Sequence, residues 1–545
     1  MAYILLWFEN LTFDLLLVAT LIACIGRLKR VGLRRFLAIL VVLAWFSARG
    51  AAIAGLAVLR FTALVNVDSA LYLLVSSTVC FGIGAVWLLV VGLRTCKDDS
   101  AVAASWPRGR LAMFTCIALG LQLMTTWNVD LAVRQQFAGL QAEAGGMGLS
   151  IAPARIPDRD NAAIVYEQSY DALEEASWSE THRDKWQDWI DLESKDFNVD
   201  DPDLKSFLKE QGPTLILLRQ AAEKAGCHFG RNYSQLSFDL MLPELTHLRQ
   251  AARLLSLDAR YRAAQGDMQT ALEDVGAIYS LAEHVGSDPL LISTLLTKAI
   301  DQVATDTFQE VLALAGQQDI AQRITSDQLQ AIDLDGSMSL ARLYQRSLRG
   351  ETAFGLNLFY QMSNGNLDWS QGFSGTTSQP SPANSFFRIF LLPDDLTSYR
   401  KIMSDFSSVA AKPFYEARDD LDNLDERFEQ EPMGIITKMI TPALAAATEQ
   451  VAQGDARHQT ARLGLAVARY RSETGDLPKT LEELVPDYIP ILPRDPFDGE
   501  FMKYRVTDDG AVIYSVGPDG KDDSGTIFDA KERQGDIVFQ LESYQ

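Results

Sequence analysis

Residues 247–286, HLRQAARLLSLDARYRAAQGDMQTALEDVGAIYSLAEHVG, indicate the fold class of this 545-residue chain. Apolar side chains recur at Leu254, Leu257 and Tyr261, a spacing that places them on one face of a helix. Gly266–Asp267 then interrupts the pattern with residues typical of a turn, and the same periodicity restarts after it. The stretch therefore predicts two helices joined by a tight turn, and residues 288–316 predict a third.

The helical pattern extends over residues 158–450, so this segment is predicted to be a mainly α-helical body. The GDMQTALEDV segment (266–275), with Tyr261 upstream, resembles the turn and second helix of a tetratricopeptide repeat. The resemblance covers about one repeat, without clean repetition at a ~34-residue period. It implies an irregular array that binds proteins or peptides; the alternative is a helical spacer. The composition also predicts a linker over 128–157 and a mobile loop over 363–385.

Four apolar stretches near the N-terminus each approach the ~20 residues that a membrane-spanning helix needs. They are about 3–26, 36–59, 70–93 and 111–127. Basic residues concentrate in the loops between the first and second stretches and between the third and fourth, which places those loops inside. The sequence therefore predicts a four-helix transmembrane head over 1–127 in contact with the lipid bilayer. A multi-pass protein of the bacterial inner (cytoplasmic) membrane follows, with both termini and residues 128–545 outside.

Charge divides the chain in the same way. Residues 1–127 hold 11 Lys and Arg against 5 Asp and Glu, whereas the whole chain carries −22, so residues 128–545 carry −28. An acidic body argues against nucleic acid as a partner, because phosphate binding requires a basic surface. It is compatible with a solvated outer surface or with cation binding.

Two charged residues fall inside the predicted spans. Asp14 and Arg49 lie at a similar depth, about 20 Å from the cytoplasmic ends of the first two helices at the rise of an α-helix. Charges at this depth are costly and are usually paired. The sequence therefore predicts an intramembrane Asp14–Arg49 ion pair. The alternative is that Arg49 reaches towards the interface or a water-filled crevice and that Asp14 is protonated.

Residues 451–545 predict a small α+β module. A long helical pattern precedes three short alternating segments, Phe501–Val506, Ala511–Val516 and Asp536–Leu541, which predict strands. The landmarks along the module are Tyr470, Gly475, Leu477–Pro478, Leu484, Leu492–Pro493, Asp495–Pro496, Tyr504, Tyr514–Gly517 and Asp519–Gly520. In this order they resemble the globular part of the major (G-type) pseudopilin of type II secretion, over about 90 residues.

The resemblance implies a short antiparallel sheet and a calcium site in the loop after Tyr514–Gly517. The matching ligand is Asp519, with Asp522, Asp523 and Asp536 as further candidates, since calcium takes carboxylate and carbonyl oxygens. The alternative is a calcium-free turn at Asp519–Gly520. The N-terminus departs from the family because it has no Gly–Phe processing site, so the chain is not expected to be a filament subunit. The whole chain resembles a group of large bacterial membrane proteins that carry this module.

No catalytic motif is present, so no catalytic residue is assigned, and no cofactor other than calcium is expected. Cys227 stands alone in the body and is predicted to be a buried apolar residue. Glu244 and His247 share a helical face as one possible metal pair. The predicted function is a non-enzymatic, membrane-anchored interaction or scaffold protein on the outer side, binding a protein partner and linked to a secretion or pilus-like system. The alternatives are an envelope enzyme with a site in the helical body and a sensor or transporter component that uses the head.

Overall fold

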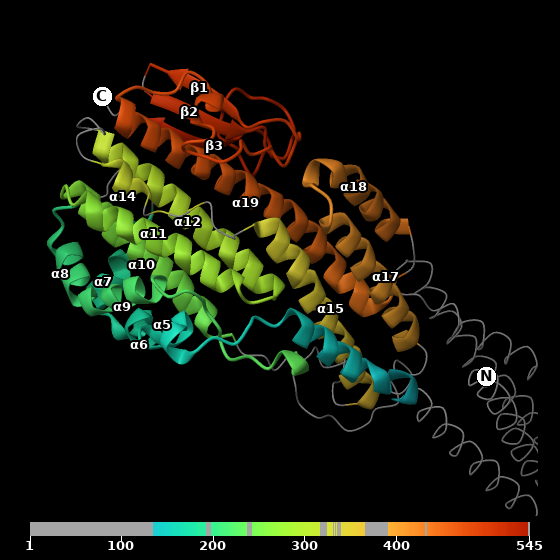
Figure 1. Ribbon diagram of the computed structural model, residues 1–545. Coiled ribbons are helices and arrows are strands. Elements are labelled where there is room, and N and C mark those ends of the chain that lie inside the picture. The colour runs from blue at the N-terminus through green and yellow to red at the C-terminus, as the bar shows by residue number, and fades with distance from the viewer. Residues whose placement is uncertain are drawn as a thin grey trace, which may run out of the picture. The chain divides into compact units, whose positions relative to one another are not determined.

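A computed structural model describes residues 134–191, 198–236, 242–316, 324–330, 332, 334, 339–365, 391–430, 433–508 and 510–542 (Figure 1). The chain divides into two compact units. The first comprises 1–143, 355–402 and 425–441, and the second comprises 144–354, 403–424 and 442–545. The chain passes between them within five helices. These are the helix over 134–151, α15 (Leu340–Asn364), α17 (Leu392–Ala410), α18 (Phe414–Gln430) and α19 (Ile435–Thr474).

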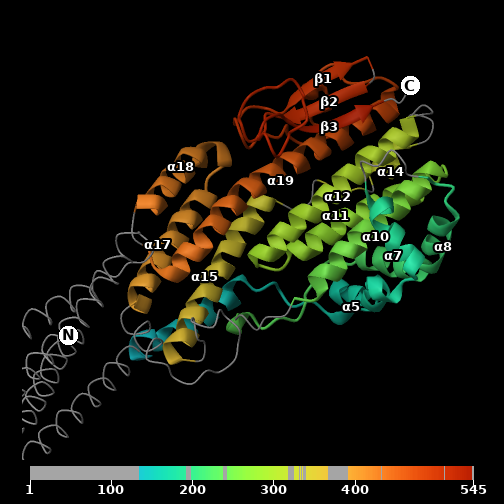
Figure 2. The ribbon, with the colours of Figure 1, turned by 180° about the vertical axis from the view of Figure 1, so that it is seen from behind.

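Three long helices form the centre of the second unit. They are α10 (Glu244–Ala264), α11 (Met268–Gly286) and α12 (Leu291–Gly316), which lie side by side in Figures 1 and 2. Gly266 turns the chain between the first two with a φ of +85°, a conformation that favours glycine. Asp267 then caps α11 by accepting a hydrogen bond from the backbone N–H of Thr270. The predicted helices and their turn are confirmed.

Shorter helices pack beside this centre: α5 (Ala162–Glu167), α6 (Tyr170–Leu173), α7 (Glu180–Ile190), α8 (Pro202–Glu210), α9 (Gly212–Ala222) and α14 (Ser326–Gln330). Trp178 lies 4.9 Å from Trp186 and 5.1 Å from Phe207, measured between ring centroids in edge-on geometry. Burial of such large rings is strongly stabilising. This aromatic cluster joins the short helices to the central core.

Within the first unit, Asp395 stabilises the start of α19. Its buried carboxylate accepts hydrogen bonds from the backbone N–H groups of Ile436 and Thr437, at 2.9 and 3.1 Å. Gly434 is required there, because a Cβ atom would lie 2.0 Å from the carboxylate carbon of Asp395. The first turn of a helix exposes unpaired N–H groups, and a carboxylate satisfies them.

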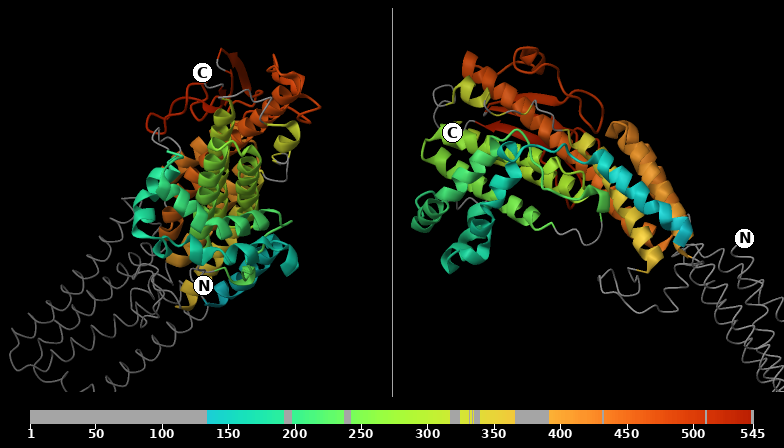
Figure 3. Two further views of the ribbon diagram at one scale, coloured as in Figure 1. Left: turned by 90° about the vertical axis from the view of Figure 1, so that its left-hand side faces the viewer. Right: turned by 60° about the horizontal axis from the view of Figure 1, so that its bottom comes forward.

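The C-terminal module contains a 3-10 turn, η6 (Leu481–Leu484), and three strands, β1 (Lys503–Thr507), β2 (Gly510–Ser515) and β3 (Ile537–Glu542). The strands form an antiparallel sheet in the order β1-β2-β3. The sheet lies along the last turns of α19 (Figures 1 and 3). The sequence predicted all three strands to within two residues of their bounds.

The module and the helical body share one core. Phe308 of α12 and Phe539 of β3 belong to the same buried cluster, with 5.8 Å between ring centroids. The side chain of Gln309 accepts a hydrogen bond from the backbone N–H of Gln540, at 2.8 Å. α12 therefore covers the β3 edge of the sheet, which removes an unpaired strand edge. The module is an integral part of the second unit and not a separately tethered domain.

The predicted linker is largely helical. Residues 134–151 form a helix, although Gly and Ala are frequent in them. Within the second unit, Gly148 lies directly against the chain near Tyr233, and a Cβ atom there would be 1.9 Å from the Tyr233 carbonyl oxygen. Gly148 therefore allows close packing, whereas the composition of the segment predicted a linker.

The membrane prediction is corrected. The four predicted spans and the Asp14–Arg49 pair lie outside the described residues. In the part of the chain that the structure describes, no helix is both long enough and apolar enough to cross a membrane. Its long helices carry charges that a span would exclude; α15 alone has Arg342, Arg346 and Arg349. The supported fold class is mainly helical with a small three-stranded antiparallel sheet, and neither the transmembrane head nor the multi-pass localisation is supported.

Candidate functional site

The acidic loop predicted to bind calcium lies between β2 and β3. Asp519 accepts a hydrogen bond from the N–H of Lys521 at 3.1 Å, which forms a local turn. Asp522 accepts from the Tyr514 hydroxyl at 3.1 Å and from the N–H of Ser524 at 2.9 Å. The carboxylates of Asp519 and Asp522 therefore form hydrogen bonds that fix the conformation of the loop.

Asp536 has a different role, because its side chain is fully buried under the same loop. Its two carboxylate oxygens accept hydrogen bonds from the N–H groups of Asp523 and Gly525, at 3.3 and 2.6 Å. Burial raises the pKa of Asp536, and these hydrogen bonds oppose the shift. The carboxylate thus orders the loop through backbone N–H groups.

The four predicted ligands do not converge. Among the described residues, no group of three or more His, Cys, Asp or Glu side chains is arranged to hold a metal ion. Calcium binding at this loop stays a prediction from the resemblance. The other proposed metal pair is also not formed: Glu244 is paired with Arg231, and His247 stacks on Tyr170 at 4.5 Å.

Asp495 explains one landmark of the module. Its buried carboxylate accepts hydrogen bonds from the N–H of Phe497, the hydroxyl of Ser515 and the N–H of Val516, at 2.8–2.9 Å. It therefore ties the Asp495–Pro496 loop to the end of β2. Buried polar groups are normally satisfied in this way.

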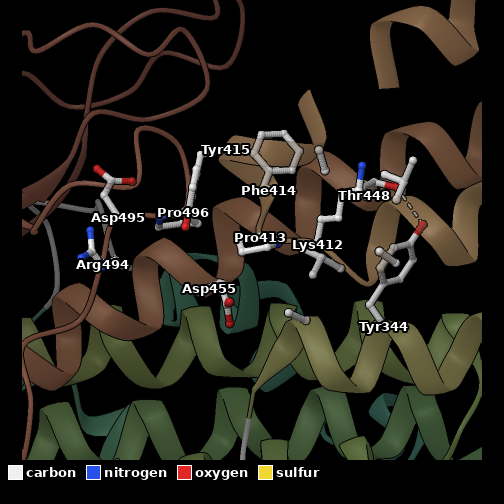
Figure 4. A pocket seen from close by; sticks show the side chains of 15 residues that line it. Tyr344, Lys412, Pro413, Phe414, Tyr415, Thr448, Asp455, Arg494, Asp495 and Pro496 are labelled. Atoms are coloured by element: carbon white, nitrogen blue, oxygen red, sulfur yellow. Dashed lines mark hydrogen bonds between the residues drawn. The ribbon is translucent and has the colours of Figure 1, made fainter. Parts of the chain in front are cut away.

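A cavity of about 270 Å³ lies where α15, α18, α19 and this loop meet, and we call it the seam pocket (Figure 4). Its lining residues are Ala341, Tyr344, Val409, Ala410, Lys412, Pro413, Phe414, Tyr415, Ala417, Thr448, Val451, Asp455, Arg494, Asp495 and Pro496. They all belong to the second unit. Aromatic, proline and aliphatic side chains make up most of the wall.

The polar groups of the seam pocket are engaged with the protein. The Tyr344 and Thr448 hydroxyls are 2.7 Å apart and hydrogen-bonded (Figure 4). Lys412 forms an ion pair with Asp420 at 2.5 Å, and Arg494 donates to the Gly499 carbonyl at 2.6 Å. The Tyr344 and Thr448 hydroxyls of this lining are bonded to each other and not to a base that would activate either as a nucleophile.

Asp455 is the one pocket carboxyl with a large pKa shift. Burial raises its pKa to about 6, and the nearby His458 and a hydrogen bond from the N–H of Leu340 act in the opposite direction. His458 lies 2.7 Å from Asp301, measured from Nδ1 to Oδ1, and also bonds to the backbone of Leu334. Burial lowers the pKa of His458, but the two carboxylates outweigh it and the net pKa is raised. Both ring nitrogens of His458 are thus hydrogen-bonded within the protein, and the bond to Asp301 joins α12 to α19.

Asp455→Asn is expected to reduce the pH dependence of stability. A carboxyl with a folded pKa of about 6 and an unfolded pKa of ~3.9 stabilises the folded state below pH ~4. This contribution to the free energy of unfolding is at most about 3 kcal/mol, and it is lost as the pH rises through 6. Urea unfolding between pH 4 and 6.5 should therefore show a flatter profile for the variant, with the exposed Asp188→Asn as control. A variant profile that matches the parent profile would contradict this assignment.

Two further charged clusters are largely buried. Arg219 bridges the buried Asp258 and Asp274, and Arg231 bridges Glu244 and the buried Asp288. Sequence reasoning missed both clusters, because their members are up to 57 residues apart and no local pattern marks them. Cys227 is a free, buried thiol as predicted. Burial raises its pKa to about 12, so it is not a reactive thiolate at neutral pH.

Comparison with known proteins finds no matching family model, no matching curated protein and no matching solved structure. The resemblances to a pseudopilin and to a tetratricopeptide repeat therefore remain predictions from the sequence. Function must be argued from the geometry of the second unit.

Proposed function

We propose that this chain is an interaction protein, and that its seam pocket receives an apolar side chain of a protein partner. The pocket volume of about 270 Å³ carries the proposal. Small-molecule sites typically enclose ~300–1,000 Å³, whereas interfaces are often anchored by one large side chain in a well-packed pocket. An aromatic and proline-rich wall suits such an anchor.

The surroundings of the pocket support this proposal. Phe414 of α18 packs edge-on against the module's Phe497, at 5.2 Å between ring centroids. Arg418 donates to the Pro518 carbonyl at 2.8 Å. Next to the pocket, Arg494 covers the ring of Phe501, which is 48% exposed. These contacts between the helical body and the module hold the wall of the seam pocket in place. Less conformational entropy is therefore lost when a partner binds.

The class of partner follows from the resemblance of the module. We propose a protein component of a secretion or pilus-like system, supported by the ordered landmarks from Tyr470 to Gly520. This step rests on similarity to a family and not on the pocket.

Filling the pocket tests the proposal. Ala341 lines the seam pocket and is half-buried, so Ala341→Trp is expected to occlude the cavity while leaving its wall residues in place. Ala446→Trp is the matched control, because Ala446 is exposed on α19 and does not line the pocket. Proteins captured with the tagged full chain after in-cell crosslinking are compared by quantitative mass spectrometry.

The partner is expected to fall at least tenfold in the Ala341→Trp capture and to persist in the control. Equal recovery with both variants would contradict a role for the seam pocket. A truncation that removes the module is a poor substitute, because it would expose the core that Phe308 and Phe539 share.

A further inference from the structure

A second cavity, which we call the cationic pocket, has a volume of about 560 Å³. Its lining comes from three parts of the second unit: the segment that follows α9, the C-terminal half of α11 and the first turns of α15. Its size falls within the range of small-molecule sites, ~300–1,000 Å³, and is about twice that of the seam pocket.

Positive charge predominates in its lining. Lys224, Arg342 and Arg346 face a single acidic residue, Glu283, in a chain whose net charge is −22. In the part of the chain that the structure describes, none of the three cations forms an ion pair with a carboxylate. Cations that converge in a concave site concentrate anions there.

The hydrogen bonds of these cations leave donors unused. Lys224 donates to the Arg159 carbonyl at 2.9 Å. Arg346 donates through one terminal nitrogen to the Ser287 carbonyl, while its buried Nε has no hydrogen-bond partner among the described residues. A buried donor without a partner is costly, and an anionic oxygen would satisfy it.

Burial disfavours the charged forms of the two remaining titratable groups of the lining. Burial lowers the pKa of His284, whose ring nitrogens are bonded to the Tyr166 hydroxyl and to the Lys224 carbonyl, both within 3.1 Å. Burial raises the pKa of the Cys227 thiol to about 12. Neither side chain offsets the positive charge or supplies a nucleophile.

We propose that the cationic pocket binds a small organic anion with a phosphate or carboxylate group. The guanidinium groups of Arg342 and Arg346, one helical turn apart on α15, bind the anionic oxygens, since arginine forms paired hydrogen bonds with such groups. This site is separate from the seam pocket and does not depend on its proposed function.

Thermal unfolding of the full chain tests the site. Inorganic pyrophosphate and citrate serve as phosphate and carboxylate probes, each compared with sodium chloride at equal ionic strength. A ligand that binds the folded state raises Tm in a saturable way. We expect such a rise with at least one probe, and the probe that acts identifies the anionic group.

Arg342→Gln should weaken the apparent affinity for the active probe about tenfold or more, as expected for the loss of a charged hydrogen bond. Arg342 is exposed, so this variant should fold; Arg346→Gln is the second variant. Arg349→Gln, on the same helix but outside the lining, should bind like the parent. No saturable rise with either probe, an equal rise in sodium chloride, or unchanged binding by both pocket variants would overturn the proposal.

Discussion

Phe539→Ala is expected to lower the free energy of unfolding by about 3–5 kcal/mol, the usual cost of removing a buried phenylalanine. The Phe539 side chain is fully buried, 5.8 Å from Phe308 between ring centroids. It also fills the space above Gly464, where a Cβ atom would lie 2.2 Å from the ring. The loss therefore removes contacts with both α12 and α19.

Urea unfolding followed by circular dichroism at 222 nm measures this effect. Because the core is shared, the helical signal of the whole second unit should shift, although the substitution is in a strand. Val506→Ala is the control, since Val506 is 48% exposed in β1 and should cost under about 1 kcal/mol. If Phe539→Ala left the helical transition unchanged, the module would be an independent domain.

Arg219→Gln is expected to destabilise the chain by about 3–5 kcal/mol, the usual cost of breaking a buried ion pair from one side. The Arg219 guanidinium lies 2.7 Å from Asp274 and 2.5 Å from Asp258, and both carboxylates are fully buried. Asp258 retains Arg262 at 3.4 Å, whereas the described residues offer Asp274 no second cation. The variant therefore leaves a buried charge without its partner.

The pH dependence of this variant distinguishes a lost charge from lost packing. Burial raises the pKa of Asp274 well above its usual value, and Arg219 opposes that shift. Without Arg219 the folded pKa rises further, so stability should fall more steeply as the pH increases. The deficit should be smaller at pH 5 than at pH 7.5, measured by urea unfolding with Arg249→Gln, an exposed position on α10, as control. An equal deficit at both pH values would indicate lost packing alone.

The sequence predicts those parts of the fold that local patterns encode. The helical spacing of Leu254, Leu257 and Tyr261, with the turn at Gly266, predicted the α10–α11 hairpin correctly. Alternation of apolar residues located the three strands. The linker over 128–157 was predicted from composition, and composition does not separate a glycine needed for close packing, such as Gly148, from one in a connecting segment.

The candidate sites could not be predicted in the same way. The seam pocket brings together residues from 341 to 496, and the cationic pocket brings Lys224 next to Arg342 and Arg346. Such groupings depend on tertiary packing and leave no periodic signal. Even Asp536, which was singled out by its loop, proves to bind backbone N–H groups.

Site-specific photocrosslinking in cells tests the seam pocket most directly. A photoreactive residue at Lys412, which is exposed and lines the pocket, is compared with one at Ala446. The proposed interface predicts a discrete crosslinked protein from position 412 that disappears when Ala341→Trp is added, and no such product from position 446. A product from position 412 that persists in the occluded variant, or the same product from position 446, would contradict the assignment.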